Sequence, residues 1–151
     1  MESEYHALLL QMMHFNRLCF LASYAQLEAL GLYPGQPQML LALMRRDGIS
    51  QRELADAMSI KPATLTVMLR RMSGKGLVER RADAHDQRVI RLSLTMEGQA
   101  LARRLHDTIE RMGAEIFGAL DPKERSQFGD MLGRISAALS EKLPKEEPTN
   151  L

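Results

Sequence analysis

Residues 50–98 read SQRELADAMSIKPATLTVMLRRMSGKGLVERRADAHDQRVIRLSLTMEG, and the order of elements in this stretch sets the architecture of the chain. Its first residues, Ser50 and Glu53, form a capping box. The serine hydroxyl can accept from the amide at the third helical position, while the glutamate reaches back to the capping residue. The helix that begins there runs to about Met58.

The second helix of the stretch has an apolar side and several polar faces. It follows the short connection Ser59-Ile60-Lys61, begins with Pro62, which is favoured in a first helical turn, and runs to about Ser73. The spacing i, i+3, i+4, i+7 predicts that its inner side holds Leu65, Met68, Leu69 and Met72. The other faces hold Lys61, Thr64, Thr66, Val67, Arg70 and Arg71.

Two strands around a charged tip come next. The segments LVERRA (77–82) and VIRLSL (89–94) flank the tip DAHDQR, and the second segment alternates apolar and polar residues as a half-buried strand does. Helix, tight turn, helix and charged hairpin is the order of a winged helix-turn-helix. In that architecture the N-terminal residues of the second helix read the DNA major groove. Here those residues are Lys61, Ala63, Thr64, Thr66 and Val67.

Positive charge gathers in the middle of the chain. Residues 44–95 hold 11 Lys and Arg against 6 Asp and Glu, a net charge of +5, and the rest holds 9 against 13, a net charge of −4. This division favours a phosphate-facing module, and an unevenly charged solvated surface is the alternative. Lys61 favours the phosphate-facing module, and a tolerated surface lysine is the alternative. A cation at a helix N-terminus costs ~0.3–1 kcal/mol against the helix dipole, but becomes favourable beside a phosphate.

The hairpin tip offers a second DNA contact. Asp86 and Arg88 lie two residues apart, so the carboxylate can pair with the guanidinium and direct it outward. An arginine held at a hairpin tip can enter a narrow, A·T-rich minor groove. The alternative is a solvated turn whose charges keep the hairpin soluble.

Long helical patterns flank the winged stretch. A helix is predicted from Tyr5 to about Leu30 with apolar residues on more than one face, followed by a loop over 31–37 and a helix over 37–46. Thr95 caps a helix whose apolar stripe ends at Phe117, and the segment Asp121-Pro122-Lys123-Glu124 opens a last helix. The final PKEEPTNL is polar and contains prolines, which predicts a disordered tail.

Composition indicates one globular unit. The chain has 151 residues, of which 45% are hydrophobic, enough for a core without disulfides or metal. It has no run of eighteen apolar residues, and its N-terminus is acidic where a secretory signal is basic, so we expect a cytoplasmic protein. The single cysteine, Cys19, cannot form an internal disulfide and is either a packed side chain or a sensor.

Residues 50–98 resemble the winged-helix core of the MarR family of bacterial transcriptional regulators. The match lies in Gly76-Leu77-Val78, in the wing motif Asp86-x-Arg88 and in Leu94-Thr95-x-x-Gly98, and the likeness extends over nearly the whole chain. The resemblance implies a mainly α homodimer with a small β-hairpin wing, whose recognition helices read a pseudo-palindrome with half-sites roughly 34–36 Å apart. It implies an N-terminal dimerisation helix (1–33), a winged helix-turn-helix (34–96), C-terminal dimerisation helices (97–143) and a tail (144–151).

The candidate DNA-binding residues are Ser50, Gln51, Ser59, Lys61, Ala63, Thr64, Thr66, Val67, Arg70, Arg71, Asp86 and Arg88. Two of them depart from the family pattern. Val67 stands where many members carry a base-contacting arginine, and Lys61 stands where a Ser or Thr cap is common. The operator sequence therefore cannot be transferred from relatives, and we expect more reliance on Arg88, Arg70, Arg71 and DNA shape.

Family members are usually released from DNA by a small, often aromatic or phenolic, ligand or by cysteine oxidation. We expect a repressor relieved by such a ligand. The segment Leu18-Cys19-Phe20 resembles the Leu-Cys-Phe of the organic-hydroperoxide sensors, which makes peroxide sensing an alternative. Tyr24 and Tyr33 are candidates for the tyrosines of those sensors, and Met39 stands where one is expected. The apolar neighbours of Cys19 do not stabilise a thiolate, which favours a packed cysteine.

We expect no enzyme, cofactor or metal site. The four histidines, His6, His14, His85 and His106, share no ligand spacing, and the methionines suit a core better than a ligand cavity. No phosphate-cradling glycine motif or nucleophile elbow occurs. Two rival functions remain: a winged-helix module that binds a protein, which the +5 charge of residues 44–95 opposes, and a thiol peroxidase activity, for which Cys19 has no obvious base.

Overall fold

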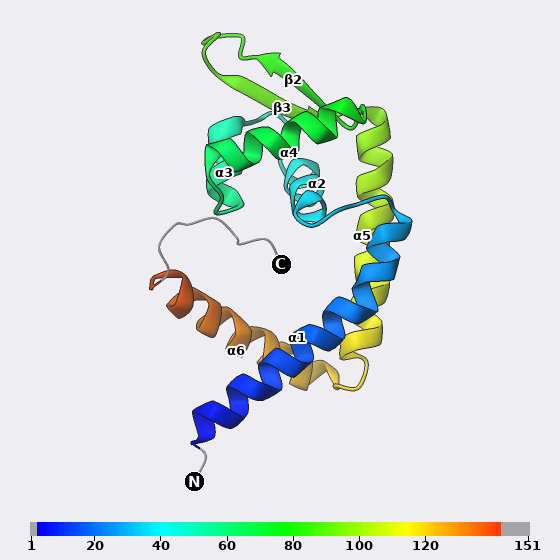
Figure 1. Cartoon of the computed structure of the whole chain (residues 1–151), viewed down its shortest axis with the longest axis vertical. Coiled ribbons are helices and arrows are strands. Elements are labelled where there is room, and N and C mark those ends of the chain that lie inside the picture. Colours follow the sequence, from blue (N-terminus) through cyan, green and yellow to red (C-terminus); the bar gives the residue numbers. More distant parts are fainter. Residues whose placement is uncertain (1–2, 143–151) are drawn as a thin grey trace.

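The computed structural model describes residues 3–142, so the predicted tail lies outside the described residues. In chain order the elements are α1 (Glu4–Ala29), α2 (Gln36–Arg45), β1 (Ile49–Ser50), α3 (Gln51–Ala57), α4 (Pro62–Gly74), β2 (Val78–Ala82), β3 (Ile90–Leu94), α5 (Met96–Phe117) and α6 (Pro122–Ser140). The sheet, α2, α3 and α4 form one end of the molecule. Helices α1 and α6 form the other end, and α5 joins the two (Figure 1). The predicted mainly α winged helix-turn-helix fold is confirmed.

The helices begin where local capping chemistry predicts. Ser50 and Asp121 each form a complete capping box, and the Thr95 hydroxyl accepts from the Gly98 amide at 3.0 Å. Each cap satisfies amides that have no partner inside the helix. These three helix starts were readable from the sequence because a cap involves residues only a few positions apart.

The sheet has one strand more than the sequence predicts. The antiparallel order is β1-β3-β2, so β3 is central, with Leu92 opposite Ile49 on one side and opposite Arg80 on the other. The prediction of a two-stranded hairpin was therefore incomplete. Strand β1 has two residues, which is too short for an alternating pattern to identify it. Its pairing attaches the segment before α3 to the wing.

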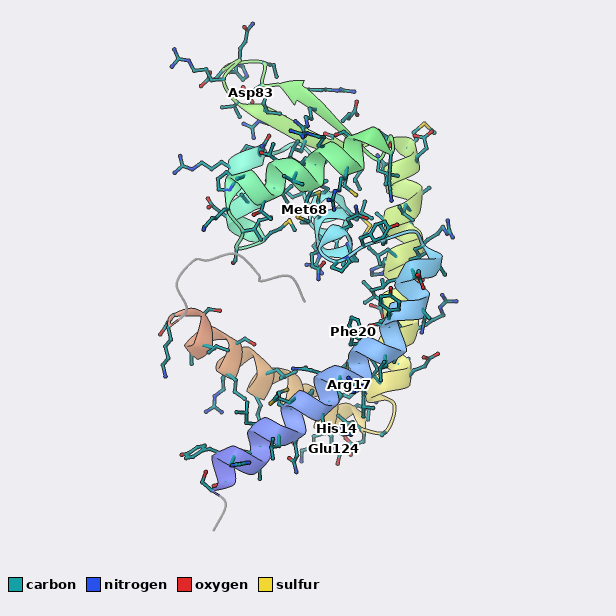
Figure 2. The ribbon with its side chains drawn as sticks, in the orientation of Figure 1. His14, Arg17, Phe20, Met68, Asp83 and Glu124 are labelled. Carbon is teal, nitrogen blue, oxygen red and sulfur yellow. The ribbon has the colours of Figure 1, made fainter. Side chains whose placement is uncertain are left out.

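The core lies inside the winged end of the molecule. It is made by fully buried side chains from α2, α3, α4, β3 and α5, among them Leu40, Leu43, Leu54, Leu65, Leu69, Met72, Leu92 and Leu105. Met68 was predicted to be buried with them. It is only half-buried, and it packs at the edge of the core on the side of α4 that faces the loop before α2 (Figure 2).

The junction between the sheet and α5 is closely packed. The Thr95 amide donates to the Leu77 carbonyl at 3.1 Å, and the Thr95 hydroxyl donates to the Gly76 carbonyl at 2.6 Å. A Cβ on Gly98 would clash with the Leu77 carbonyl oxygen. The glycine thus lets the first turn of α5 lie directly against the start of β2.

Helices α1 and α6 have no buried residue among the described ones. They meet α5 through a chain of aromatic rings, with Phe15 and Phe117 6.2 Å apart and Phe117 and Phe128 5.8 Å apart between centroids. Large apolar side chains remain at least half exposed on both helices: Tyr5, Leu8, Leu9, Leu10, Met13, Leu18, Phe20, Leu21 and Tyr24 on α1, and Met131, Ile135 and Leu139 on α6. A soluble monomer rarely exposes so much apolar surface.

Candidate DNA interface

The start of α3 is fixed by reciprocal hydrogen bonds. The Glu53 amide donates to the Ser50 hydroxyl at 3.2 Å, and the Ser50 amide donates to the Glu53 carboxylate at 2.9 Å. Arg46, just after α2, approaches the same carboxylate at 2.6 Å. Hydrogen bonds from Ser50, aided by the charge of Arg46, lower the pKa of Glu53 to about 2. Ser50 therefore has a structural task besides any contact with DNA.

The turn between α3 and α4 is a Schellman motif centred on Ser59. The Ser59 amide donates to the Asp56 carbonyl at 3.1 Å, and the Ile60 amide donates to the Ala55 carbonyl at 3.0 Å. Ser59 has a φ of 54°, in the left-handed region that glycine usually occupies. Ser59, whose exposed side chain is a candidate DNA contact, therefore has a backbone conformation that is unfavourable for residues other than glycine.

Helix α4 presents a mixed surface outside its buried side. Leu65, Leu69 and Met72 are buried as predicted. The exposed candidates on or beside the helix are Lys61, Ala63, Val67, Arg70 and Arg71, whereas Thr64 and Thr66 are half-buried. Lys61 is the N-cap and forms no side-chain cap. The first two turns therefore offer a cation, small side chains and hydroxyls, which suits phosphate and base-edge contacts.

Gln51 connects the two helices of the motif. Its side-chain amide donates to the Thr66 hydroxyl at 3.1 Å, and that hydroxyl donates to the Pro62 carbonyl at 2.8 Å. The hydroxyl proton of Thr66 is therefore used in a hydrogen bond within the protein. Toward DNA, Thr66 can offer the remaining lone pair and its methyl group, which suit a base amino group or a thymine methyl.

The wing tip is organised by two aspartates. Asp83 accepts from the amides of His85 at 2.8 Å and Asp86 at 3.0 Å. Asp86 in turn accepts from the backbone amide of Arg88 at 3.0 Å. The predicted side-chain pair between Asp86 and Arg88 was wrong. Within residues 3–142 no ion pair joins their side chains, and the Asp86 carboxylate instead accepts from the main-chain amide of Arg88. Arg88 remains exposed.

Sequence reasoning missed a charged network at the base of the wing. The Arg91 guanidinium donates through Nε to Asp83 at 2.7 Å and through Nη1 to the Gly48 carbonyl at 3.3 Å, and Nη1 lies 3.6 Å from the Glu53 carboxylate. The amide of His85, the Arg91 guanidinium and the amide of Asp86 together lower the pKa of Asp83 to about 2. The sequence feature that indicates this network is Arg91 itself, a charged residue between the apolar residues Ile90 and Leu92 of one strand.

The remaining features to consider are the single cysteine, a possible metal site and a possible membrane-spanning helix. Cys19 is half-buried on α1, and its carbonyl accepts from the Ser23 hydroxyl at 2.7 Å. Among residues 3–142, no cluster of three or more His, Cys, Asp or Glu side chains is placed to hold a metal ion. No helix in the same range is long and apolar enough to cross a membrane.

Comparisons with known proteins agree with this geometry. A model of the MarR family matches residues 30–89. The HTH-type transcriptional repressor Rv2887 of Mycobacterium tuberculosis is 29% identical over 113 residues, which cover 75% of this chain and 81% of that protein. The transcriptional regulator HosA of Escherichia coli O157:H7 is 31% identical over 100 residues, which cover 66% of this chain and 74% of that regulator.

A solved structure supports the same assignment. The MepR–DNA complex of S. aureus superposes with a TM-score of 0.75 and 25% sequence identity, covering 91% of this chain and 99% of that one. The family match, the related regulators and the shared fold with a DNA-bound protein lead to one conclusion. The chain belongs to the MarR family of winged-helix, DNA-binding transcriptional regulators.

Proposed function

We propose that the chain is a cytoplasmic homodimeric repressor that binds a pseudo-palindromic operator and leaves it when a small molecule binds. The observation that carries the proposal is the outer surface of the helix-turn-helix and wing. Exposed cations lie at the N-cap of α4 (Lys61), along α4 (Arg70 and Arg71) and at the wing tip (Arg88), and α4 also carries the half-buried Thr64 and Thr66. The arginines and the lysine supply phosphate attraction, and the first turns of α4 supply groups that can distinguish bases.

The homodimer is supported by the uncovered apolar faces of α1 and α6. Full burial of a large apolar side chain contributes about 1.5–3 kcal/mol, so covering these faces would strongly favour association. A groove of about 660 Å³ lies between α5 and α6, and its lining residues include Ile109, Phe117, Phe128 and Leu132. A second copy of the chain can pack against this apolar surface. In this arrangement 1–33 and 97–143 are the dimerisation segments, and 34–96 is the DNA-binding domain.

Release by a small molecule is supported by a second pocket, where α1 ends against α5. It has a volume of about 400 Å³, and Leu30, Arg104, Thr108 and Arg111 are among its lining residues. This size falls within the range of small-molecule sites. The lining also includes Asp107 and Glu110, so the pocket offers two cations and two carboxylates around the apolar side chain of Leu30. The two arginines can bind the phenolate or carboxylate of an aromatic ligand, and the acids can accept from its hydroxyl groups. The pocket touches both the N-terminal helix and α5, so an occupant would affect the joint between the two ends of the molecule.

Fluorescence-anisotropy titration tests the DNA-binding proposal. Labelled duplexes tiled across the DNA upstream of the gene would be compared with a scrambled duplex over a series of salt concentrations. We expect one native duplex to bind at least ~10³-fold more tightly than the scrambled one, with affinity falling steeply as salt rises. Weak binding of equal strength to all duplexes, with no salt dependence, would contradict the proposal and favour a protein partner instead.

Two variants separate the contributions of wing and helix. Arg88→Ala should weaken binding and reduce the salt dependence by about one phosphate contact, while the dimer persists in sedimentation. Thr66→Ala should reduce discrimination between native and scrambled duplexes, because Thr66 faces DNA with a lone pair and a methyl group. An equal loss of affinity on both duplexes would assign Thr66 to the phosphate backbone instead.

The effector proposal has its own measurement. Benzoic and hydroxybenzoic acids would be added to the bound native duplex, and release would be followed by anisotropy. We expect release by one of these acids, and a weaker response in Arg104→Gln, which removes one cation from the pocket. Release that is equal in the variant and the unmodified protein would place the ligand elsewhere.

A further inference from the structure

Arg91 connects three separate parts of the winged domain. It lies on the central strand β3, opposite Ser50 of β1 on one side and opposite Arg81 of β2 on the other. Its guanidinium contacts Asp83 at the start of the wing tip, the carbonyl of Gly48 before β1 and, at 3.6 Å, Glu53 in the first turn of α3. A planar guanidinium can serve several acceptors at fixed angles, which an ammonium cannot do.

The far end of this connection is the tip residue Arg88. One carboxylate oxygen of Asp83 accepts from Arg91, and the other accepts from the amides of His85 and Asp86. Asp86 then accepts from the Arg88 amide. A continuous path of contacts therefore runs from Arg91 through both aspartates to the backbone of Arg88. Figure 2 shows Asp83 at the wing, beyond the helices that carry the core.

The near end of the connection is rigid. Glu53 is held by the Ser50 amide at 2.9 Å and by Arg46 at 2.6 Å, and it belongs to the first turn of α3. Helix α3 is in turn joined to the recognition helix by the hydrogen bond between Gln51 and Thr66. The hairpin is anchored at its start by the buried residues Val78, Leu92 and Leu94. Toward the tip, Arg80, Arg81 and Ala82 of β2 are exposed, so burial contributes little there.

We propose that Arg91 is a positioning residue, which holds the wing at a fixed orientation to α3 and α4 and so sets where Arg88 meets the DNA. Nε and Nη1 of Arg91 are directed at protein oxygens, which suits a role in ordering the wing. The inference rests on the proposed function for its consequence on DNA binding. The ordering of the wing by Arg91 is a property of the free protein and can be measured without DNA.

Hydrogen exchange of the free, full-length protein tests the ordering directly. Arg91→Gln should accelerate exchange of the His85 and Asp86 amides by about tenfold or more, because Asp83 loses its anchor. Core amides such as those of Leu65 and Leu69 should exchange as before, which shows that the domain is folded. Unchanged exchange at the wing tip would overturn the proposal, whatever the DNA affinity.

A charge-conserving variant gives the matched control. Arg91→Lys keeps the positive charge but cannot reproduce the forked contacts with Asp83 and Gly48. We expect Arg91→Lys to lose wing protection and DNA affinity nearly as Arg91→Gln does. Full recovery of DNA affinity by lysine would mean that Arg91 supplies charge, which would overturn its role as a positioning residue.

A double-mutant cycle on the tightest native duplex tests the path to Arg88. We expect Arg91→Gln to lower the affinity and the salt dependence by no more than Arg88→Ala does, and to lower neither any further in the Arg88→Ala background. Additive losses of affinity, or a further reduction of the salt dependence when Arg91→Gln is added to Arg88→Ala, would overturn the proposal. If Arg88→Ala alone has no effect, the wing contact of the proposed function fails, and hydrogen exchange still decides whether Arg91 orders the wing.

Discussion

Ser59 is the single residue other than glycine, within residues 3–142, whose φ lies in the left-handed region. Helices α1 and α4 end in the same hydrogen-bonding pattern, but there the left-handed residues are Gly31 and Gly76. A left-handed conformation costs a residue with a side chain about 1–2 kcal/mol, and glycine costs roughly 0.5–1 kcal/mol of chain entropy. The backbone of Ser59 is therefore strained, and this residue lies in the turn that sets the angle between α3 and α4.

Ser59→Gly should relieve this strain. We expect the free energy of unfolding in urea to rise by up to about 1 kcal/mol, because the gain in the turn exceeds the entropy cost. Gly31→Ser is the matched control in the same motif, and it should lower stability by a similar amount. A Ser59→Gly variant that is more stable but binds DNA less tightly would assign the serine hydroxyl to DNA contact.

The two acidic residues of the wing network predict a particular response to pH. Asp83 and Glu53 have pKa values lowered to about 2 from ordinary values of 3.8 and 4.5. A carboxylate with a lowered pKa in the folded state stabilises the fold above its ordinary pKa, and this contribution is lost as pH falls toward the folded value. The network should therefore be constant from pH 8 to about 5 and weaken between about pH 4.5 and 2.

Urea unfolding at a series of pH values measures this effect. The double variant Asp83→Asn with Glu53→Gln should show a shallower loss of stability between about pH 4.5 and 2 than the unmodified protein. Asp130→Asn, which removes an exposed carboxylate of α6 outside the network, should leave the slope as it was. Equal slopes in all three proteins would show that the network contributes nothing to folding.

The packing of α5 against the sheet depends on the absence of a side chain at Gly98. Gly98→Ala would place a methyl group onto the Leu77 carbonyl, and backbone oxygen atoms cannot move aside as a flexible side chain can. We expect a loss of about 1–3 kcal/mol in the free energy of unfolding, despite the better helix propensity of alanine. Gly74→Ala is the control, because that glycine is helical, exposed and has open space around it.

Thermal or urea unfolding of the two variants would decide the point. The expected order of stability places Gly74→Ala at or above the unmodified protein, by up to about 1 kcal/mol, and Gly98→Ala below it. If both substitutions were neutral, α5 could shift away from β2 at little cost. The joint between the sheet and α5 would then be looser than the contacts of Thr95 indicate.

The limits of sequence reasoning are visible in these same elements. Helix starts at Ser50, Thr95 and Asp121 were predictable because each cap involves neighbouring residues. Strand β1 was missed because two residues contain no periodicity, and its partner β3 lies some forty positions away. The role of Arg91 was missed for the same reason: its contact with Gly48 spans 43 positions, and only the folded chain brings them together.

Within the candidate DNA interface, the burial of a residue was easier to predict from the sequence than its hydrogen-bond partners. Periodicity identified Leu65, Leu69 and Met72 as buried residues of α4, whereas Met68, predicted on the same face, is only half-buried. The sequence did not indicate that Asp86 would bind the amide of Arg88, or that Gln51 would occupy the Thr66 hydroxyl. Such pairings depend on backbone turns and helix separations, which a linear pattern does not contain.

The exposed apolar surface at the end of the molecule opposite the sheet leads to a prediction about assembly. Leu9 is 62% exposed on α1, so Leu9→Glu should do little harm to an isolated chain. If α1 packs against a second copy, a buried and unpaired charge would strongly weaken that contact. We expect the unmodified protein to sediment as a dimer, and Leu9→Glu to sediment as a monomer with much weaker operator binding.

The control uses the same substitution at an exposed apolar residue near the sheet. Met96 is 83% exposed at the start of α5, and Met96→Glu should leave the mass measured by sedimentation unchanged. The melting temperature of the unmodified protein should rise with protein concentration, as expected when folding and association are coupled. Monomeric behaviour of the unmodified protein at all concentrations would refute the dimer.

Helix α5 begins at the sheet and runs without interruption to the aromatic contacts with α1 and α6. Its 22 residues make a rod about 33 Å long. A rotation of about 6° at the far end of such a rod displaces the near end by about 3.4 Å, which is the rise of one base pair along a DNA strand. In a dimer, therefore, a change of a few degrees among the end helices would be enough to put the two recognition helices one base pair out of register. A repressor built in this way could be switched by a tilt far smaller than the motion of a hinge or the unfolding of a segment.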